Sequence, residues 1–213
     1  MTKKGRFIVF EGGEGTGKST QTRLLGEALT ERGLDVLLTR EPGGTPGAEA
    51  IRTLLLHPPG EGWGVQAEAL LFAAARSDHV HKLILPALDR GQWVIADRFL
   101  DSSRAYQGMA GGLGDSAVQG LHKVGSGGLL PDLTILLRAP GESVAKRLAL
   151  RDGQNSDAIG GRNSEYHEAV GRAFDSFAQQ SPERFALVEG DADPQTVHRR
   201  VLDAIETVLG DPG

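Results

Sequence analysis

Residues 12–19 have the sequence Gly12-Gly13-Glu14-Gly15-Thr16-Gly17-Lys18-Ser19, which is the strongest single indication of the fold. The pattern G-x-x-x-x-G-K-S is typical of a loop that binds the phosphates of a nucleoside triphosphate. Its glycines let backbone N–H groups approach a polyphosphate closely, Lys18 supplies a cation, and the Ser19 hydroxyl can coordinate Mg²⁺. The helix expected to begin here directs the positive end of its dipole at the same phosphates.

The sequence on either side of this loop supports the prediction. Before the loop, Arg6-Phe7-Ile8-Val9-Phe10 is an apolar, strand-forming run, and after it Leu24, Leu25, Ala28 and Leu29 repeat at helical spacing. Strand, loop and helix in this order is the context in which the motif binds phosphate. The alternative is a glycine-rich turn without a ligand, and this context makes it the less favoured interpretation.

Composition limits the class of protein. With 213 residues, of which 39% are hydrophobic and 24% charged, the chain has the size and composition of a single globular domain. Its net charge of −5 argues against a broad nucleic-acid-binding surface. The absence of cysteine excludes disulfides, thiolate catalysis and cysteine-based zinc sites. Neither a secretory signal pattern nor an apolar stretch of membrane-spanning length is visible, so we expect a cytoplasmic protein without a membrane partner.

Apolar runs alternate with helical patterns along the chain, which predicts an α/β fold. Five strands are expected, at 6–11, 35–40, 93–98, 132–138 and 185–189. Helices are expected at 18–32, 46–56, 66–90, 115–126, 141–151, 165–180 and 194–209. Asp193 is predicted to cap the last helix, with Pro194 in its first turn. Right-handed crossovers then produce a five-stranded parallel sheet with helices on both faces, and ligands bind at the carboxyl ends of such strands.

Asp97 and Arg98 directly follow the apolar run Trp93-Val94-Ile95-Ala96. An aspartate after such a strand commonly lies near Mg²⁺ in P-loop proteins, so Asp97 is a candidate metal ligand. The alternative is a surface Asp–Arg pair, which is frequent and weak. The segment that follows, from Phe99 to Gly108, is dense in Arg, Ser, Tyr and Gln side chains that suit a small polar ligand with a phosphate. A hydrated loop is the alternative for this segment.

Two further segments carry weaker signals. The run from Thr39 to Thr45 contains Pro42-Gly43-Gly44, which forms a sharp loop after the second strand. Phe72 and Arg76 lie four residues apart, so they share a helical face and together could stack and hydrogen-bond a planar base. From spacing alone, the favoured alternative is that Phe72 lies in the core and that Arg76 extends to solvent. The six histidines form no metal-ligand set, so the expected chemistry is phosphoryl transfer by positioning and charge.

Together these motifs resemble those of the thymidylate kinase family, from about residue 6 to about residue 190. The resemblance is carried by Phe10-Glu11-Gly12 through Lys18-Ser19-Thr20, Thr39 to Thr45, Leu71 to Arg76, Asp97 to Gly108, and Leu130 to Thr134. It implies a P-loop NTPase fold of the nucleoside monophosphate kinase type. It also implies transfer of the γ-phosphoryl group of ATP to dTMP with Mg²⁺, a role in dTTP synthesis, and a homodimer.

The family pattern assigns roles to the matching residues. It implies that ATP is held by Gly12, Gly13, Glu14, Gly15, Thr16, Gly17, Lys18, Ser19 and Thr20, and Mg²⁺ by Ser19 and Asp97. Phe72 is expected to stack on thymine, Arg76 to donate to the base edge, and Ser103 to contact the N3 side. Tyr106 is expected against the deoxyribose, with Gln107 in the same pocket.

The remaining assignments concern the phosphates. Arg98 is expected to bind the dTMP phosphate, with Arg40, Glu41 and Pro42 nearby. Glu14 is expected near the sugar 3′-OH and the acceptor end. With Lys18, Arg98 and Glu14 are candidates for a direct part in catalysis.

The chain departs from the family pattern at the position of the catalytic arginine. Gly15 stands where some members carry an arginine in the P-loop, and members without it supply one from a mobile lid. The lid corresponds to about 151–165, within one 1–213 domain, and Ala158 aligns with the expected arginine. Arg151 and Arg162 are the candidates to replace it, and Arg172 is a shifted alternative. Such an arginine offsets the charge that spreads over the transferring phosphoryl group.

Two other functions remain open from the sequence. A kinase of another nucleoside monophosphate would leave the set of Phe72, Arg76 and Tyr106 unexplained. A nucleotide-binding switch, or an inactive relative with little kinase activity, is the other alternative, although the Asn-Lys-x-Asp guanine motif is absent from the sequence. A side-by-side comparison of monophosphate substrates separates these possibilities.

Overall fold

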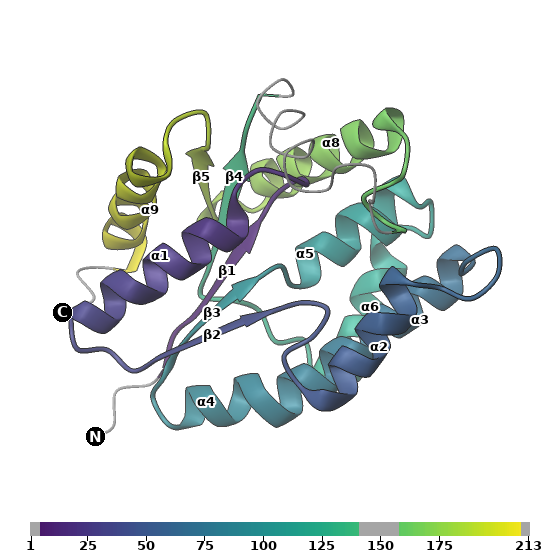
Figure 1. Cartoon of the computed structure of the whole chain (residues 1–213), viewed down its shortest axis with the longest axis horizontal. Coiled ribbons are helices and arrows are strands. Elements are labelled where there is room, and N and C mark those ends of the chain that lie inside the picture. The colour runs from purple at the N-terminus through teal and green to yellow at the C-terminus, as the bar shows by residue number, and fades with distance from the viewer. Residues whose placement is uncertain (1–4, 141–157, 210–213) are drawn as a thin grey trace.

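The centre of the molecule is a five-stranded parallel sheet (Figure 1) in a computed structural model that describes residues 5–140 and 158–209. The strands are β1 (Phe7–Glu11), β2 (Val36–Arg40), β3 (Trp93–Asp97), β4 (Leu133–Arg138) and β5 (Phe185–Glu189). They lie in the order β2-β3-β1-β4-β5, and each neighbouring pair is parallel. The five predicted strands are therefore confirmed to within one residue at each end.

The central strand β1 is buried on both faces of the sheet, which explains why it is apolar without alternation. Its side chains divide between two layers, with Ile8 and Phe10 in one and Phe7 and Val9 in the other. The first layer is covered by α1 (Lys18–Glu31) and α9 (Pro194–Leu209) (Figure 1). These two helices contribute the buried side chains Leu25, Leu29, Val197, Val201 and Ile205.

The opposite face of the sheet carries the larger group of helices. The long helical segment α3 (Val65–His79), η1 (Val80–Ile84) and α4 (Leu85–Asp89) lies here with α6 (Asp115–Ser126). On the outer side, α2 (Pro46–Leu56) packs against α3, and α8 (Ser164–Gln180) covers β4 and β5 (Figure 1). A short 3₁₀ turn, η3 (Pro182–Arg184), leads into β5.

Six of the predicted helices are confirmed to within one residue, and the predicted helix at 141–151 lies outside the described residues. Asp193 caps α9 as expected, because its Oδ1 accepts hydrogen bonds from the N–H groups of Gln195 and Thr196. The pattern did not predict that the 65–89 helix contains a π-helical turn, η1, where the Leu85 N–H donates to the Val80 carbonyl. This wider turn precedes Pro86, which has no N–H to donate.

Residues 100–110 are helical, although none of the predicted helices covers them. They form α5 (Leu100–Ser103) and a π-helical segment, η2 (Arg104–Ala110). The segment is polar in composition yet mostly buried, because its charged and polar side chains are paired inside the protein. The hydrated-loop alternative for this segment is therefore wrong. Within the described ranges, no helix is long and apolar enough to cross a membrane.

Candidate active site

The loop at residues 12–17 joins the carboxyl end of β1 to the amino end of α1. Gly12, Gly15 and Gly17 have φ angles of 138°, 68° and 101°, which favour glycine. A Cβ on Gly12 would lie 2.4 Å from the Leu137 carbonyl oxygen, so the chain passes too close for any side chain. The loop therefore has the tight, side-chain-free course that phosphate binding by backbone N–H groups requires.

Lys18 folds back over this loop, where its Nζ donates a hydrogen bond to the Gly13 carbonyl at 2.7 Å. Burial lowers the pKa of Lys18 to about 8, and the nearby Arg98 lowers it further, whereas Asp97 and Glu14 act in the opposite direction. A bound polyphosphate would supply the negative charge that such a buried ammonium lacks.

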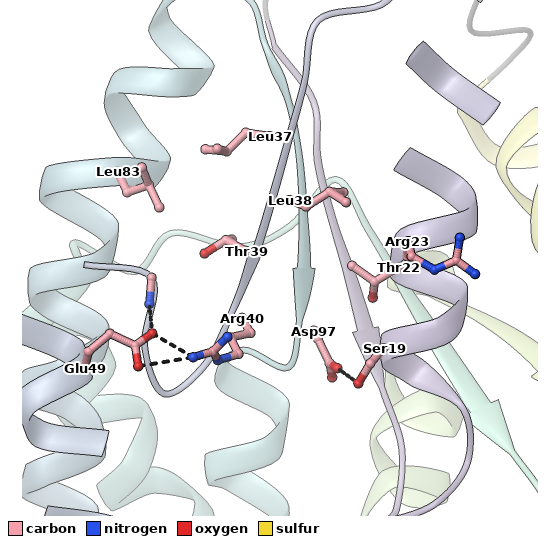
Figure 2. A pocket seen from close by; sticks show the side chains of 11 residues that line it. Ser19, Thr22, Arg23, Leu37, Leu38, Thr39, Arg40, Glu49, Leu83 and Asp97 are labelled. Carbon is pink, nitrogen blue, oxygen red and sulfur yellow. Dashed lines mark hydrogen bonds and ion pairs between the residues drawn. The ribbon is translucent and has the colours of Figure 1, made fainter. Parts of the chain in front are cut away.

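Ser19 and Asp97 meet between α1 and the end of β3. The Ser19 hydroxyl donates to Asp97 Oδ2 at 2.5 Å (Figure 2). A hydroxyl and a carboxylate beside a phosphate-binding loop are the hard oxygen ligands that Mg²⁺ prefers, with phosphate oxygens and water filling the other positions. These two side chains belong to the wall of a groove of about 580 Å³ that extends along β2 to Arg40 and Glu49 (Figure 2).

Arg98 is the centre of a charged cluster beside the loop. Its Nη1 donates to the Gly12 carbonyl at 3.1 Å and to Ser102, and its Nη2 donates to Glu14 at 2.5 Å. The guanidinium also lies over the Tyr106 ring, 5.2 Å from its centroid. Burial alone would lower the pKa of Arg98, but Tyr106, Glu14 and Asp97 raise it above the ordinary arginine value. The group therefore stays charged and is held against the phosphate-binding loop.

Glu11 lies beneath this cluster and is fully buried. Its Oε1 accepts hydrogen bonds from the N–H groups of Phe99 and Ser102 at 2.9 and 3.0 Å, and its Oε2 accepts from the Ser102 hydroxyl at 2.5 Å. Burial raises the pKa of Glu11 to about 7, with a further rise from Asp101 and opposing effects from Arg98 and these hydrogen bonds. Glu11 thus connects the end of β1 to the turn that carries Arg98.

Arg76 lies in a second, buried cluster on α3. Its Nε donates to Glu41 Oε2 at 2.7 Å, and its Nη2 donates to Ser103 Oγ at 2.9 Å and to the Phe99 carbonyl at 3.0 Å. Phe72, one turn earlier on the same helix, is half-buried. The alternative in which Arg76 extends to solvent is therefore wrong, because the guanidinium is anchored inside the protein.

Gln107 and Arg162 meet at Glu68, also on α3. Gln107 Nε2 donates to Glu68 Oε1 at 2.9 Å, and Arg162 Nη2 donates to Glu68 Oε2 at 2.5 Å. Arg162 also hydrogen-bonds to Tyr166 and lies over its ring. Tyr166 in turn donates to the Tyr106 carbonyl at 2.6 Å. Arg162, just before α8, and Tyr166, in its first turn, thus connect this part of the chain to η2 at Gln107 and Tyr106.

The structure brings most of the predicted site residues to one edge of the sheet. Arg40 is exposed and paired with Glu49 at 3.0 Å, whereas Glu41 and Pro42 are buried behind it. Thr20 is exposed on α1. Arg172 is exposed on α8 and faces Glu168 at 3.8 Å, and Arg151 lies outside the described residues.

The prediction from sequence missed several polar residues that hold this site together. They are Glu11, Thr39, Glu68, His79 and Ser102. A signal for two of them existed, because Glu68, Phe72, Arg76 and His79 recur every three or four residues and so share one face of α3. Glu11 also stood out as an acid at the end of a buried strand.

The sheet order and the phosphate-binding loop define the class of this chain as a P-loop enzyme with the nucleoside monophosphate kinase fold. The family model described as thymidylate kinase matches residues 10–201. The chain therefore belongs to the thymidylate kinase family, and it phosphorylates dTMP to dTDP with ATP as donor, a reaction of dTTP biosynthesis.

Individual relatives agree with this assignment. The chain is 52% identical to the thymidylate kinase of Rhizorhabdus wittichii, over 96% of this chain and 99% of the relative. It is 48% identical to that of Rhodopseudomonas palustris strain TIE-1, over 98% of this chain and 92% of the relative. The crystal structure of thymidylate kinase from Ehrlichia chaffeensis has a TM-score of 0.78 and 31% identity, and the match covers 95% of this chain and 99% of that one.

Proposed function

We propose that the dTMP kinase reaction takes place at the cluster around Arg98, with the dTMP phosphate bound by this guanidinium. The observation that carries the proposal is the 3.1 Å hydrogen bond from Arg98 to the Gly12 carbonyl. A phosphate on Arg98 would lie directly beside the loop that holds the phosphates of ATP, so acceptor and donor are brought together. Glu14, paired with the same guanidinium, would face the sugar 3′-OH, and Arg40 would approach from β2.

The nucleoside part of dTMP would lie between α3 and η2. Phe72 would stack on thymine, Arg76 would donate to the base edge, and Ser103 would contact the N3 side. Support comes from Arg76 and Ser103 being hydrogen-bonded to one another in a buried setting, where a mismatched base leaves groups unpaired. Tyr106 and Gln107 would line the sugar side of this pocket, and Glu41 and Pro42 would close it from behind.

ATP would be held by residues 12–20, and Mg²⁺ by Ser19 and Asp97. Their close approach supports this assignment, because the two oxygens are already 2.5 Å apart at the end of the loop. When bound, Mg²⁺ offsets the charge of the phosphates. Lys18, buried and directed into the loop, would place a second cation on the β- and γ-phosphates.

Arg162 or Arg151 would supply the arginine that contacts the transferring phosphoryl group, from a movable segment at about 151–165 of a single domain. Arg162 is paired with Glu68, so it would have to exchange this carboxylate for the phosphates. Residues 151–157, with Arg151, lie outside the described residues. Arg172 faces Glu168 on the exposed side of α8 and is the weaker alternative.

The test measures ADP formation from MgATP with dTMP, dUMP, dCMP, AMP and GMP compared side by side. We expect strong stimulation by dTMP, and a shift of selectivity towards the other pyrimidines in Phe72→Ala and Arg76→Gln. Unchanged selectivity in both variants would place the base elsewhere. Single-turnover measurements of Arg162→Ala and Arg151→Ala identify the catalytic arginine. If the rate of phosphoryl transfer falls in only one variant, the arginine replaced in that variant is the catalytic one. Full activity in both variants overturns the lid assignment.

A homodimer is the oligomeric state that we propose. The helices α2, α3 and α6 lie next to one another and expose Leu54, Leu70 and Val124, respectively. Exposed apolar side chains gathered on neighbouring helices are typical of a protein interface. A cytoplasmic location stays a prediction from the sequence.

A further inference from the structure

A chain of polar side chains runs from the edge strand β2 into the helical layer behind Arg76. Its middle member, His79 at the end of α3, has no exposed surface. His79 Nε2 lies 2.7 Å from Thr39 Oγ1, and His79 Nδ1 lies 3.0 Å from Glu41 Oε1. The other carboxylate oxygen of Glu41 accepts the hydrogen bond from Arg76 Nε. Thr39, His79, Glu41 and Arg76 are thus connected in series.

The chemistry of Glu41 determines the direction of these hydrogen bonds. A carboxylate paired with an arginine can only accept, so Nδ1 of His79 must carry the proton that it shares with Glu41. In the neutral imidazole Nε2 is then an acceptor, and the Thr39 hydroxyl donates to it. Glu41 therefore fixes the proton on Nδ1 of His79, and the Thr39 hydroxyl holds the other side of the ring at Nε2.

The backbone around this chain leaves little freedom for rearrangement. Gly44 lies so close that a Cβ there would be 2.6 Å from both His79 Nε2 and Thr39 Oγ1. The loop after β2 is thus packed directly on the histidine. A ring held between a hydroxyl, a carboxylate and the backbone of Gly44 has one orientation. Through its hydrogen bond from Nδ1, the fixed ring also fixes the position of the Glu41 carboxylate.

Glu41 in turn leaves Arg76 with one free nitrogen. Nε and Nη2 are bound to Glu41, Ser103 and the Phe99 carbonyl, whereas Nη1 has no hydrogen-bond partner among the residues that the structure describes. Nη1 is therefore the donor available to a ligand. Its direction depends on how Glu41 fixes the plane of the guanidinium.

We propose that His79 is a positioning residue for nucleotide recognition, which holds Glu41 and thereby directs Arg76 at the acceptor edge of the base. The proposal rests on the proposed role of Arg76 in contacting that edge. Thymine presents a carbonyl oxygen there, where cytosine presents an amino donor. Correct positioning of Arg76 therefore contributes to the choice of dTMP over dCMP.

Two variants of His79 separate its two hydrogen bonds. Asparagine places an amide nitrogen near the position of Nδ1, so His79→Asn can keep the hydrogen bond to Glu41 and lose the one to Thr39. Glutamine reaches the position of Nε2, so His79→Gln can keep the hydrogen bond to Thr39 and lose the one to Glu41. We expect His79→Gln to raise KM for dTMP about tenfold, since a hydrogen bond to a charged group is lost. KM for ATP should stay unchanged, the ratio of kcat/KM for dTMP over dCMP should fall, and His79→Asn should be affected much less.

A control variant and Arg76→Gln distinguish the possible failures. His198→Gln removes another largely buried histidine, on α9, far from the polar side chains between Thr39 and Arg76. This variant should leave KM for dTMP unchanged. If Arg76→Gln leaves the dTMP to dCMP ratio unchanged, the proposed base site fails. If Arg76→Gln lowers this ratio while His79→Gln does not, or if both His79 variants raise KM equally, the positioning role of His79 is overturned.

The wild-type enzyme offers a test that does not depend on the folding of a variant. Nitrogen-15 NMR of the histidine side chains reports which ring nitrogen carries the proton. The expected result is a proton on Nδ1 of His79, retained when dTMP is added. A proton on Nε2 alone would contradict the proposal, because that tautomer cannot donate from Nδ1 to Glu41.

Discussion

Arg98 combines an unfavourable backbone conformation with a fully engaged side chain. Its φ of 70° makes it the single non-glycine residue with positive φ in the described part of the chain. An L-residue in this region is disfavoured by roughly 1–2 kcal/mol. The conformation is held by contacts of the neighbouring backbone, since the N–H groups of Phe99 and Ser102 both donate to Glu11. Strain of this kind is typical of functional positions.

Arg98→Gly and Arg98→Ala form a matched pair that separates the backbone from the side chain. Both variants lose the guanidinium, so we expect kcat/KM for dTMP to fall at least about a hundredfold in each. Their stabilities should differ, with Arg98→Gly more stable by about 1 kcal/mol, because only glycine tolerates positive φ without strain. Urea denaturation measures this difference. Equal stability of the two variants would show that the turn relaxes once the side chain is gone.

Glu11 makes stability depend on pH. Burial raises the pKa of Glu11 to about 7 in the folded state, against 4.5 in the unfolded chain. The folded protein therefore binds the proton more tightly, and the stability that this provides is complete below pH 4.5 and lost as pH rises through about 7. In Glu11→Gln this loss is absent. We expect the unfolding free energy of the variant, relative to wild type, to increase by about 2–3 kcal/mol between pH 5 and pH 8.

Equilibrium urea denaturation at several pH values measures this difference. His122 and His198 also titrate in the folded protein, but both are present in wild type and variant, so their contributions cancel in the comparison. A constant difference across the pH range would mean that Glu11 is ionised throughout.

The clearest limit of prediction from sequence concerns the contacts of individual residues. The helical spacing of Phe72 and Arg76 favoured a solvent-directed arginine, and only the family resemblance indicated a binding role. The spacing could not show that Glu41, from a loop 35 residues earlier, would face Arg76. Glu11 and His79 were missed for the same reason, since their partners come from distant parts of the chain.

The helical segment α5–η2 illustrates how an element can be stabilised by polar contacts. Arg104 donates to Asp101 and to Asp115 at 2.7 Å, and its guanidinium lies 3.9 Å from the centroid of the Phe177 ring on α8. Asp101 is also paired with Arg184 at 3.1 Å. The apolar periodicity on which helix prediction depends is absent here, because ion pairs replace apolar contacts. Such an element becomes visible only when its partners on α6, η3 and α8 are known.

Replacing Arg104 tests this account of the segment. In Arg104→Met the apolar stem can still pack on Phe177, but the buried Asp101 loses one of its two arginine partners. A buried carboxylate that is only partly compensated is costly, so we expect a loss of about 3 kcal/mol in the unfolding free energy, measured in urea. Arg23→Met is the matched control, because Arg23 forms an exposed pair with Glu27 on α1 and should cost about 0.5 kcal/mol. Similar losses in both variants would contradict the buried-network interpretation.

For the whole molecule, the fold could be predicted because its signals are local and repeated. Each strand is a short apolar run ending in loop residues, and most crossover helices have an apolar face. The five strands and six of the predicted helices therefore agree with the structure to within one residue. The strand order β2-β3-β1-β4-β5 could not be deduced from these patterns, since pairing depends on contacts between distant runs. The surface of the proposed dimer also depends on which helices lie next to one another in the fold.

The proposed dimer predicts which exposed leucine matters. Leu70 on α3 is 56% exposed and lies on the helix between α2 and α6, whereas Leu187 on β5 is 50% exposed at the opposite edge of the sheet. The two side chains are matched in chemistry and exposure but differ in location. If α2, α3 and α6 form the interface, a lysine at Leu70 buries an unpaired charge in the dimer, while a lysine at Leu187 remains in solvent.

Sedimentation velocity of the wild type, Leu70→Lys and Leu187→Lys measures the result. We expect dimers for the wild type and Leu187→Lys, and a folded monomer for Leu70→Lys, with circular dichroism confirming the fold. Val124→Lys on α6, at a position that is 89% exposed, should weaken the same dimer. Dissociation by Leu187→Lys alone would move the interface to the β5 edge. A monomeric wild type would mean that the apolar residues on these helices serve another contact.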